Sequence, residues 1–300
     1  PKPILERYKY DMAGDKNLSK WVLSVIDVDK RKVTDFNIER WQDQDAEVRY
    51  VTDKGDKIFF ERYNRVRDEV ELCVGNTETG EVKVLIHEVD KPYIDYHMRN
   101  IVFLNEGNDI LYRSECTGWA HYYHYDGNGN LKNTITSGDW VAGQIAAIDT
   151  VGRTVYLYAH GYDKKMNPYY YQVVKAHIDR EGVKLLSPED GQHKAEFSKS
   201  RKYFVDSYSR VDMEPRFTLK DNNGRVIIKD LANSTVDTMT ALTRAKVLFA
   251  ELGNDDLLEW VSYEIAGYPA DANLPDYRKV RGRLVGSYIK GSMASHMKWT

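Results

Sequence analysis

Several features that would point to a particular class of protein are scarce or missing in this chain. Its 300 residues include only two cysteines, Cys73 and Cys116, which are too few for a disulfide framework. No run approaches the ~18 apolar residues of a membrane-spanning helix, and the opening residues lack the apolar core of a signal peptide. The net charge of −3 argues against nucleic acid as a main partner, because phosphate binding needs concentrated lysine and arginine.

Aromatic residues are plentiful, with 22 tyrosines, and tyrosine suits half-buried strands. The segment from Gly107 to Trp140 shows the pattern most clearly. It predicts three short strands: Ile110–Ser114, Trp119–Tyr125 and Leu131–Thr136. The glycines and asparagines of Asp126–Asn130 supply the positive φ angles of a tight hairpin between the last two.

Similar groups of four strands recur along the first ~230 residues, with a period of about 40 to 50 residues that is typical of propeller blades. Further strands are expected at Trp21–Val28, Val48–Val51, Ile58–Tyr63, Val70–Val74, Val82–Ile86, Ile101–Leu104, Val141–Asp149, Thr154–Tyr158, Tyr169–Ala176, Val183–Leu186, Lys194–Ser198, Tyr203–Ser207, Arg216–Leu219 and Arg225–Ile228. The fold class is therefore mainly β, a partial β-propeller of four-stranded antiparallel blades, with a β-sandwich as the competing interpretation.

About four and a half blades are visible, which makes an incomplete ring. Blades bury their faces against their neighbours, so a break in the ring exposes an apolar flank and open strand edges. Further chain, a second copy or a cap must cover that flank.

Residues 1–228 resemble the N-terminal propeller domain of the dipeptidyl-peptidase IV family of serine peptidases, in a bacterial version. The order and spacing of the matching pieces carry the resemblance. These pieces are Glu6–Tyr10 with Ala13–Asp15, Arg62–Arg65, Ser114–Glu115 with Gly118–Trp119 and His121, Thr136–Trp140, Asn167–Tyr170, Leu185–Glu189, and Phe197–Ser198 with Tyr203–Asp206.

The resemblance implies a hydrolase domain and peptide substrates as partners, and a periplasmic or secreted location. In that family the catalytic serine lies on a G-x-S-x-G elbow of the hydrolase domain, and paired glutamates of the propeller hold the substrate amino terminus. This chain contains neither a G-x-S-x-G motif nor a Glu-Glu pair. No catalytic residue is therefore carried over, and the chain alone is expected to be inactive.

The hydrophobic period becomes helical after Ile228. Apolar residues recur on one helical face from Val236 to Leu252, and a second face runs from Leu257 to Ile265. Ser234 is a candidate N-cap, while Gly253 and Gly267 end the two helices. We expect residues 229–300 to form a small α-helical module built on a helical hairpin.

This tail is similar to the AbiTii domain of phage-defence proteins, through Gly253-Asn254, Leu258–Trp260, Gly267–Pro269 and Leu274–Arg278. That resemblance implies a cytoplasmic location. A peptidase propeller followed by such a module is unexpected, so a natural join and a composite or engineered join near residues 225–230 both stay open. The segment Gly291–Met297 resembles a cloning scar, or it continues the AbiTii-like sequence.

Four short patterns resemble functional motifs, but we prefer a structural or chance explanation for each of them. His121 and His124 fall on opposite faces of a strand and are expected on its surface. Asp126–Asn130 imitates a calcium loop, but Leu131 and Ser137 stand where that loop needs Gly and Glu. Ser287–Lys290 matches S-x-x-K without its companion motifs. The two cysteines are interpreted as buried thiols in preference to one disulfide.

Glu115, Trp119, Asp139 and Trp140 could line a propeller face, although structural roles are preferred, and Trp119 is expected to be buried between blades. No catalytic, cofactor-binding or metal-binding residue is assigned. Three functions stay open. The first is the non-catalytic propeller region of a serine exopeptidase, which gates access to its hydrolase domain. The second is a binding or assembly module that uses the propeller faces and the helical tail, with a second copy of the chain as one partner, and the third is a phage-defence module with an unrelated propeller fused to it.

Overall fold

The computed structural model describes residues 5–7, 19–95, 98–229, 238–251, 253, 255–272, 287–289 and 292–294. The chain divides into two compact units, Pro1–Asp230 and Leu231–Thr300. Each unit is described by itself, and their independent folding stays a prediction. Among the described residues, the helices are too short or too polar to cross a membrane.

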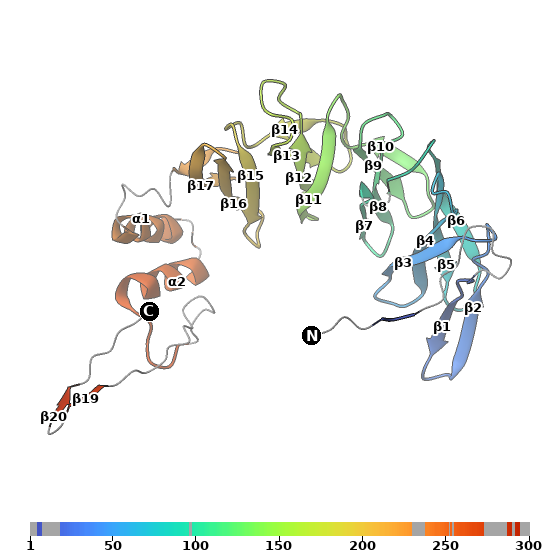
Figure 1. The fold of residues 1–300 in the computed structure, drawn as a ribbon, viewed down its shortest axis with the longest axis horizontal. Coiled ribbons are helices and arrows are strands. Elements are labelled where there is room, and N and C mark those ends of the chain that lie inside the picture. Colours follow the sequence, from blue (N-terminus) through green and yellow to red (C-terminus); the bar gives the residue numbers. More distant parts are fainter. Residues whose placement is uncertain are drawn as a thin grey trace. The chain divides into compact units, whose positions relative to one another are not determined.

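The first unit consists of one hairpin and four meandering sheets of four strands, all antiparallel (Figure 1). The hairpin is β1 (Leu23–Asp27) with β2 (Lys32–Phe36). Blade 1 comprises β3 (Asp45–Val51), β4 (Lys57–Tyr63), β5 (Glu69–Asn76) and β6 (Val82–Val89); blade 2 comprises β7 (Ile101–Leu104), β8 (Asp109–Ser114), β9 (His121–Asp126) and β10 (Leu131–Thr134). Blade 3 comprises β11 (Val141–Asp149), β12 (Thr154–His160), β13 (Tyr171–His177) and β14 (Val183–Leu185); blade 4 comprises β15 (Gln192–Phe197), β16 (Tyr203–Arg210), β17 (Met213–Asp221) and β18 (Val226–Ile228).

The turn between β9 and β10 forms as its glycine and asparagine residues predict. Asp126 accepts hydrogen bonds from the backbone N–H groups of Asn128 and Asn130, at 2.8 and 2.9 Å, so the hairpin between β9 and β10 is confirmed. Gly129 has a φ of 87° there, and a Cβ at this position would collide with the carbonyl of Leu85. Glycine is therefore required both by the turn and by the approach of blade 1 to blade 2.

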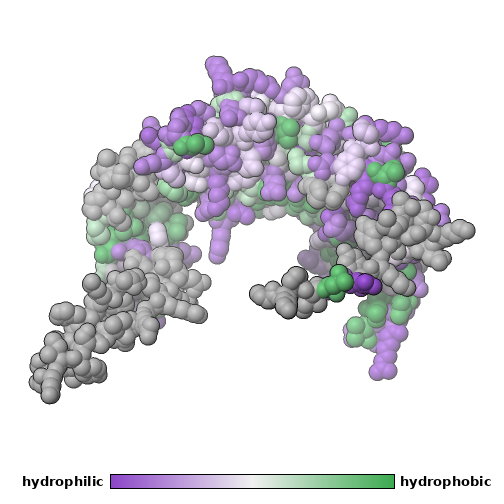
Figure 2. Space-filling model, viewed as in Figure 1, coloured by the Kyte–Doolittle hydropathy of each residue, from purple (hydrophilic) through white to green (hydrophobic). Residues whose placement is uncertain are grey.

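Apolar clusters join each sheet to the next along the chain. Four clusters draw their buried residues from two successive sheets, as Phe59 of blade 1 and Ile110 of blade 2 do in one of them. Equivalent clusters join the hairpin to blade 1, blade 2 to blade 3, and blade 3 to blade 4. Because both faces of a middle sheet are covered, β8 is buried along its whole length. The face seen in Figure 2 is mostly hydrophilic over these sheets.

Charged side chains, some of them buried, lie beside the apolar clusters. Between blades 1 and 2, Arg99 lies 2.6 Å from Glu61 and 3.0 Å from Glu88. Between blades 2 and 3, Arg153 bridges Asp109 and Asp179, with its Nη1 3.2 Å from Asp109. These ion pairs fix which groups face one another across a junction, because an unpaired charge there would be costly.

The structure corrects the expectation for Trp119, whose side chain is 41% exposed. The chain is still turning at this residue and β9 begins only at His121, so the indole lies outside the sheet, 5.8 Å from the ammonium of Lys164. The buried indole is instead Trp140, which donates to the carbonyl of Ser137 at 2.7 Å and packs edge-on against His121.

Other expectations were also wrong. His121 and His124 are both buried, not on the surface, since each imidazole finds a polar partner: Gly138 O at 2.8 Å for His121 and Asp109 at 2.6 Å for His124. Both cysteines are free thiols, as expected, and Cys73 is buried, but the expected burial of Cys116 is wrong because this residue is exposed on a turn. Strand β2 was not predicted, because its sequence KVTDF alternates only weakly.

The second unit contains α1 (Thr238–Glu251) and α2 (Asp255–Ala266), followed by the hairpin β19 (Ser287–Ile289) with β20 (Ser292–Ala294). Gly253, with a φ of 61°, lies between the two helices. Val261 of α2 is fully buried, as the helical period predicts. Ser234 and Lys290 lie outside the described residues, so their predicted roles are not tested.

The tryptophans provide a matched pair for a stability test. Trp140→Ala is expected to lower the free energy of unfolding by about 3–5 kcal/mol, the range for removing a large buried aromatic side chain. Trp119→Ala is expected to lower it by less than about 1 kcal/mol, because its ring is largely solvated. Urea unfolding of both variants measures the difference, and equal losses would contradict the assigned positions.

Acid is expected to weaken the junction between blades 2 and 3. Burial raises the pKa of Asp109, but hydrogen bonds from Arg153, His124 and Asn105 outweigh it and lower this pKa to about 2, from an ordinary value of 3.8. A depressed folded-state pKa means that the stabilisation is present above pH ~4 and is lost as the pH falls towards 2. The stability gap between the natural chain and Asp109→Asn should therefore shrink over this range in urea unfolding; a constant gap would refute it.

Candidate functional site

A cavity of about 570 Å³ opens in the first unit, among residues of blades 2, 3 and 4. This volume lies within the range of small-molecule sites. Its lining residues come from the segment before β7, from three adjacent blades, and from both strands of the pair β11–β12. They are Met98, Arg99, Asn100, Arg113, Tyr122, Gly143, Gln144, Tyr158, His160, Tyr171, Gln192, His193 and Lys194.

Arg113 of β8 is the most deeply buried cation of this lining that has no carboxylate in contact with it. Its side chain is 4% exposed. Nε donates to the carbonyl of Ala142 at 2.6 Å and Nη1 donates to that of Met98, while Nη2 has no partner. Burial lowers the pKa of this guanidinium. The partners of this positive charge are therefore two backbone carbonyls, one in β11 of blade 3 and one in the segment before β7.

His160, at the end of β12, lies beside a break in the regular pairing of β11. The register between β11 and β12 shifts between Ala142 and Ile145, where Gly143 stands. A Cβ at Gly143 would lie 3.1 Å from Nε2 of His160, so glycine leaves room for the imidazole. Burial, and secondarily the charge of Arg113, lowers the pKa of His160, which favours a neutral ring at neutral pH.

Aromatic and amide side chains complete the wall. Tyr171 packs edge-on against His160 with 4.4 Å between the ring centroids. Tyr122 donates from its hydroxyl to the carbonyl of Gly143 at 3.0 Å. Gln192 accepts from the backbone N–H of Tyr171 at 3.0 Å, which leaves its amide NH₂ as a donor. Such a wall suits a ligand with both apolar and amide groups.

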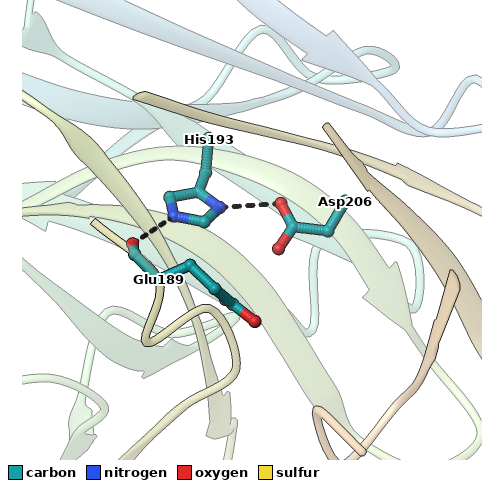
Figure 3. Close-up of side chains that lie close together, drawn as sticks. All are labelled: Glu189, His193 and Asp206. Carbon is teal, nitrogen blue, oxygen red and sulfur yellow. Dashed lines mark hydrogen bonds and ion pairs between the residues drawn. The ribbon is translucent and has the colours of Figure 1, made fainter. Parts of the chain in front are cut away.

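A second cluster lies next to this cavity, between blades 3 and 4 (Figure 3). Potential ligand atoms of Glu189, His193 and Asp206 lie within 4.8 Å of one another. His193 is 2.8 Å from Asp206 through Nδ1 and 2.7 Å from the carbonyl of Glu189 through Nε2. Taken alone, these three residue types are common ligands of a metal ion.

Lys220 supplies the cation of this cluster. Its ammonium lies 2.8 Å from Asp206 and 2.7 Å from Glu189, and it also donates to the carbonyl of Leu186 at 3.3 Å. The lysine is fully buried, and its charge compensates the carboxylates that would otherwise attract a metal. We therefore assign the cluster a structural role at the junction of blades 3 and 4.

None of the cavity residues was singled out from the sequence. Glu115, which the sequence suggested as a residue of a propeller face, lines a separate small cavity together with Asp95 and Arg113. Burial raises the pKa of Glu115. The one available signal was Gly143 inside an expected strand, since an isolated glycine in a strand often marks a bulge. The lining residues are spread over some 100 positions, and only the stacking of the blades brings them together.

The four meandering sheets, packed face to face, define a partial β-propeller. The family model of the dipeptidyl peptidase IV (DPP IV) N-terminal region matches residues 1–215. The chain therefore belongs to this family. A second model, AbiTii, matches residues 225–299 and so runs through the segment that resembles a cloning scar.

Curated relatives agree with this assignment. The probable dipeptidyl peptidase 4 of Trichophyton verrucosum is 24% identical over 219 residues, which cover 69% of this chain and 28% of that protein. Dipeptidyl peptidase 4 of Trichophyton rubrum is also 24% identical, over 69% of this chain and 27% of that protein. The chain thus spans less than a third of the length of these relatives.

A solved structure shows the same fold. The structure of Porphyromonas gingivalis dipeptidyl peptidase 4 superimposes with a TM-score of 0.60 at 24% identity, covering 75% of this chain and 32% of that one. A putative dipeptidyl aminopeptidase IV from Bacteroides ovatus gives a TM-score of 0.55 at 20% identity. At these identities the likeness establishes the propeller fold alone.

The buried lysine cluster yields a stability prediction. Lys220→Met would leave Asp206 and Glu189 without their cation, so we expect a loss of about 3–5 kcal/mol in the free energy of unfolding. Lys194→Met is the matched control, because its ammonium pairs with Glu196 in solvent and is worth at most about 1 kcal/mol. Urea unfolding compares the two, and similar losses would show that Lys220 does not hold the junction.

Proposed function

We propose that this chain is the non-catalytic β-propeller region of a dipeptidyl-peptidase-IV-like serine exopeptidase, in which it gates the access of peptides to a hydrolase domain. The observation that carries the proposal is the family match over residues 1–215, together with four-stranded sheets in which strands that are consecutive in the chain pair with each other. The names of the relatives, dipeptidyl peptidase 4, supply the expected substrate class, which is peptides.

The residues of this chain suit binding better than cleavage. The sequence contains no G-x-S-x-G elbow and no Glu-Glu pair, so a nucleophile and an anchor for the substrate amine would have to come from other residues. The cavity offers aromatic rings, amides and a buried guanidinium. These groups hold and orient a peptide, and His160 lies in the same cavity without a serine or cysteine among its lining residues.

Partners follow from the same proposal. Further blades or the hydrolase domain would cover the open face of the propeller, and a second copy of the chain is the alternative cover. On this proposal the protein works in the periplasm or outside the cell.

A second candidate rests on the match of the AbiTii model to residues 225–299 and on the helices α1 and α2 within that range. It makes the chain a phage-defence module with an unrelated propeller fused to it, and the chain then works in the cytoplasm. The gene around the chain separates the two: a G-x-S-x-G hydrolase sequence favours the peptidase, and a continuing AbiTii-type sequence favours defence.

The purified chain is expected to release no chromophore from X-Pro dipeptide p-nitroanilides. The reason is that its residues include no elbow serine to attack the substrate. Absorbance at increasing protein concentration measures the rate, with an active dipeptidyl peptidase as the positive control. Turnover that rises with the chain and disappears after treatment with a serine-directed covalent inhibitor would overturn the non-catalytic assignment.

A further inference from the structure

The lining of the 570 Å³ cavity carries an imbalance of charge. Three of its lining residues, Arg99, Arg113 and Lys194, are cationic at neutral pH, and the lining contains no aspartate or glutamate. Arg99 is compensated by Glu61 and Glu88 from outside the lining, and Lys194 is compensated by Glu196. Arg113 is left as the cation of this wall that contacts only neutral groups.

Arg113 lines two cavities of opposite charge. The second, smaller cavity includes Asp95 and Glu115. Burial has the largest effect on the guanidinium and lowers its pKa, while the charges of Glu115 and Asp95 act from a distance and raise it. Nη2 has no hydrogen-bond partner. A buried donor without a partner gains from a hydrogen bond to a charged acceptor, so an anion that reached Nη2 from the large cavity would be stabilised.

The rest of the wall indicates what kind of molecule carries that anion. Gln144 and Gln192 each present an amide, which donates and accepts like a peptide group. Tyr158 and Tyr171 offer aromatic faces for apolar side chains, and the two ring centroids are 5.8 Å apart. Side-chain amides, aromatic surface and one guanidinium that no carboxylate contacts together fit a short peptide that bears a carboxylate.

We propose that this cavity binds the carboxylate of a short peptide, either at its C-terminus or on an acidic side chain, and that Arg113 is the residue that selects it. This inference rests on the proposed function, because that function supplies peptides as the class of ligand. Nη2 is buried, so the carboxylate reaches it only when the side chains that cover it move, and Arg113 keeps its two bonds to backbone carbonyls.

Isothermal titration calorimetry of the intact chain tests the site with four probes: N-acetyl-Ala-Ala-Ala as free acid and as amide, and N-acetyl-Ala-Glu-Ala amide with its Gln counterpart. We expect the carboxylate member of at least one pair to bind about tenfold or more tightly than its neutral partner. The first pair identifies a C-terminal carboxylate and the second an acidic side chain. Binding without any preference in either pair, or no binding at all, overturns the proposal.

Two variants assign the preference to this cavity. Arg113→Gln is expected to abolish the difference between acid and neutral probe. Because this substitution also removes the hydrogen bonds to Met98 and Ala142, the binding result for Arg113→Gln counts only if the variant keeps the melting transition of the unmodified chain. Gln144→Trp is the second variant: Gln144 is exposed at the rim, so an indole there blocks the cavity without disturbing the core and should abolish binding. Unchanged binding in a folded Gln144→Trp variant places the peptide elsewhere and refutes the assignment.

Mass spectrometry of the peptides after each titration separates this inference from the proposed function. Intact peptides with no acid preference would overturn the carboxylate site alone. Peptides cleaved by the chain would instead overturn its non-catalytic role, whatever their affinity.

Discussion

The packing of each sheet against the next is the interaction on which the rest of this structure depends. A single four-stranded meander has two faces to cover and no way to cover them itself. Here the apolar clusters are shared between successive sheets, so each blade stabilises its neighbours. Gly129, whose Cβ would collide with the Leu85 carbonyl, shows how closely two blades approach. The stability of the first unit therefore resides in its junctions more than in its individual sheets.

Charged groups buried at the same junctions add specificity to this packing. Arg99 and Lys220 each join carboxylates that belong to different strands or to the connections between blades. Buried ion pairs of this kind contribute little net stability relative to apolar packing, but they penalise any other register. Arg113 departs from the pattern because no carboxylate contacts it. Its place in the wall of the 570 Å³ cavity is the reason to regard it as a binding group.

Local patterns in the sequence were sufficient to predict most strands. Runs such as Ile101–Leu104 and Val141–Asp149 are bounded by turn residues, and both were placed with the observed limits. Burial across blades was harder to predict: Trp119 and Trp140 both follow glycine-containing turns, and only the tertiary packing decides which indole is covered. The cavity could not be predicted for the same reason, since Arg113, His160 and Gln192 come from three different blades.

Hydrogen exchange of backbone amides, measured strand by strand, tests the central claim that the junctions hold this unit together. The claim predicts the strongest protection in β8 and β12, which belong to sheets covered on both faces, and weaker protection in β1, β2 and β18, whose residues are exposed or half-buried for the most part. Protection that is equal in all strands, or strongest in the β1–β2 hairpin, would contradict it.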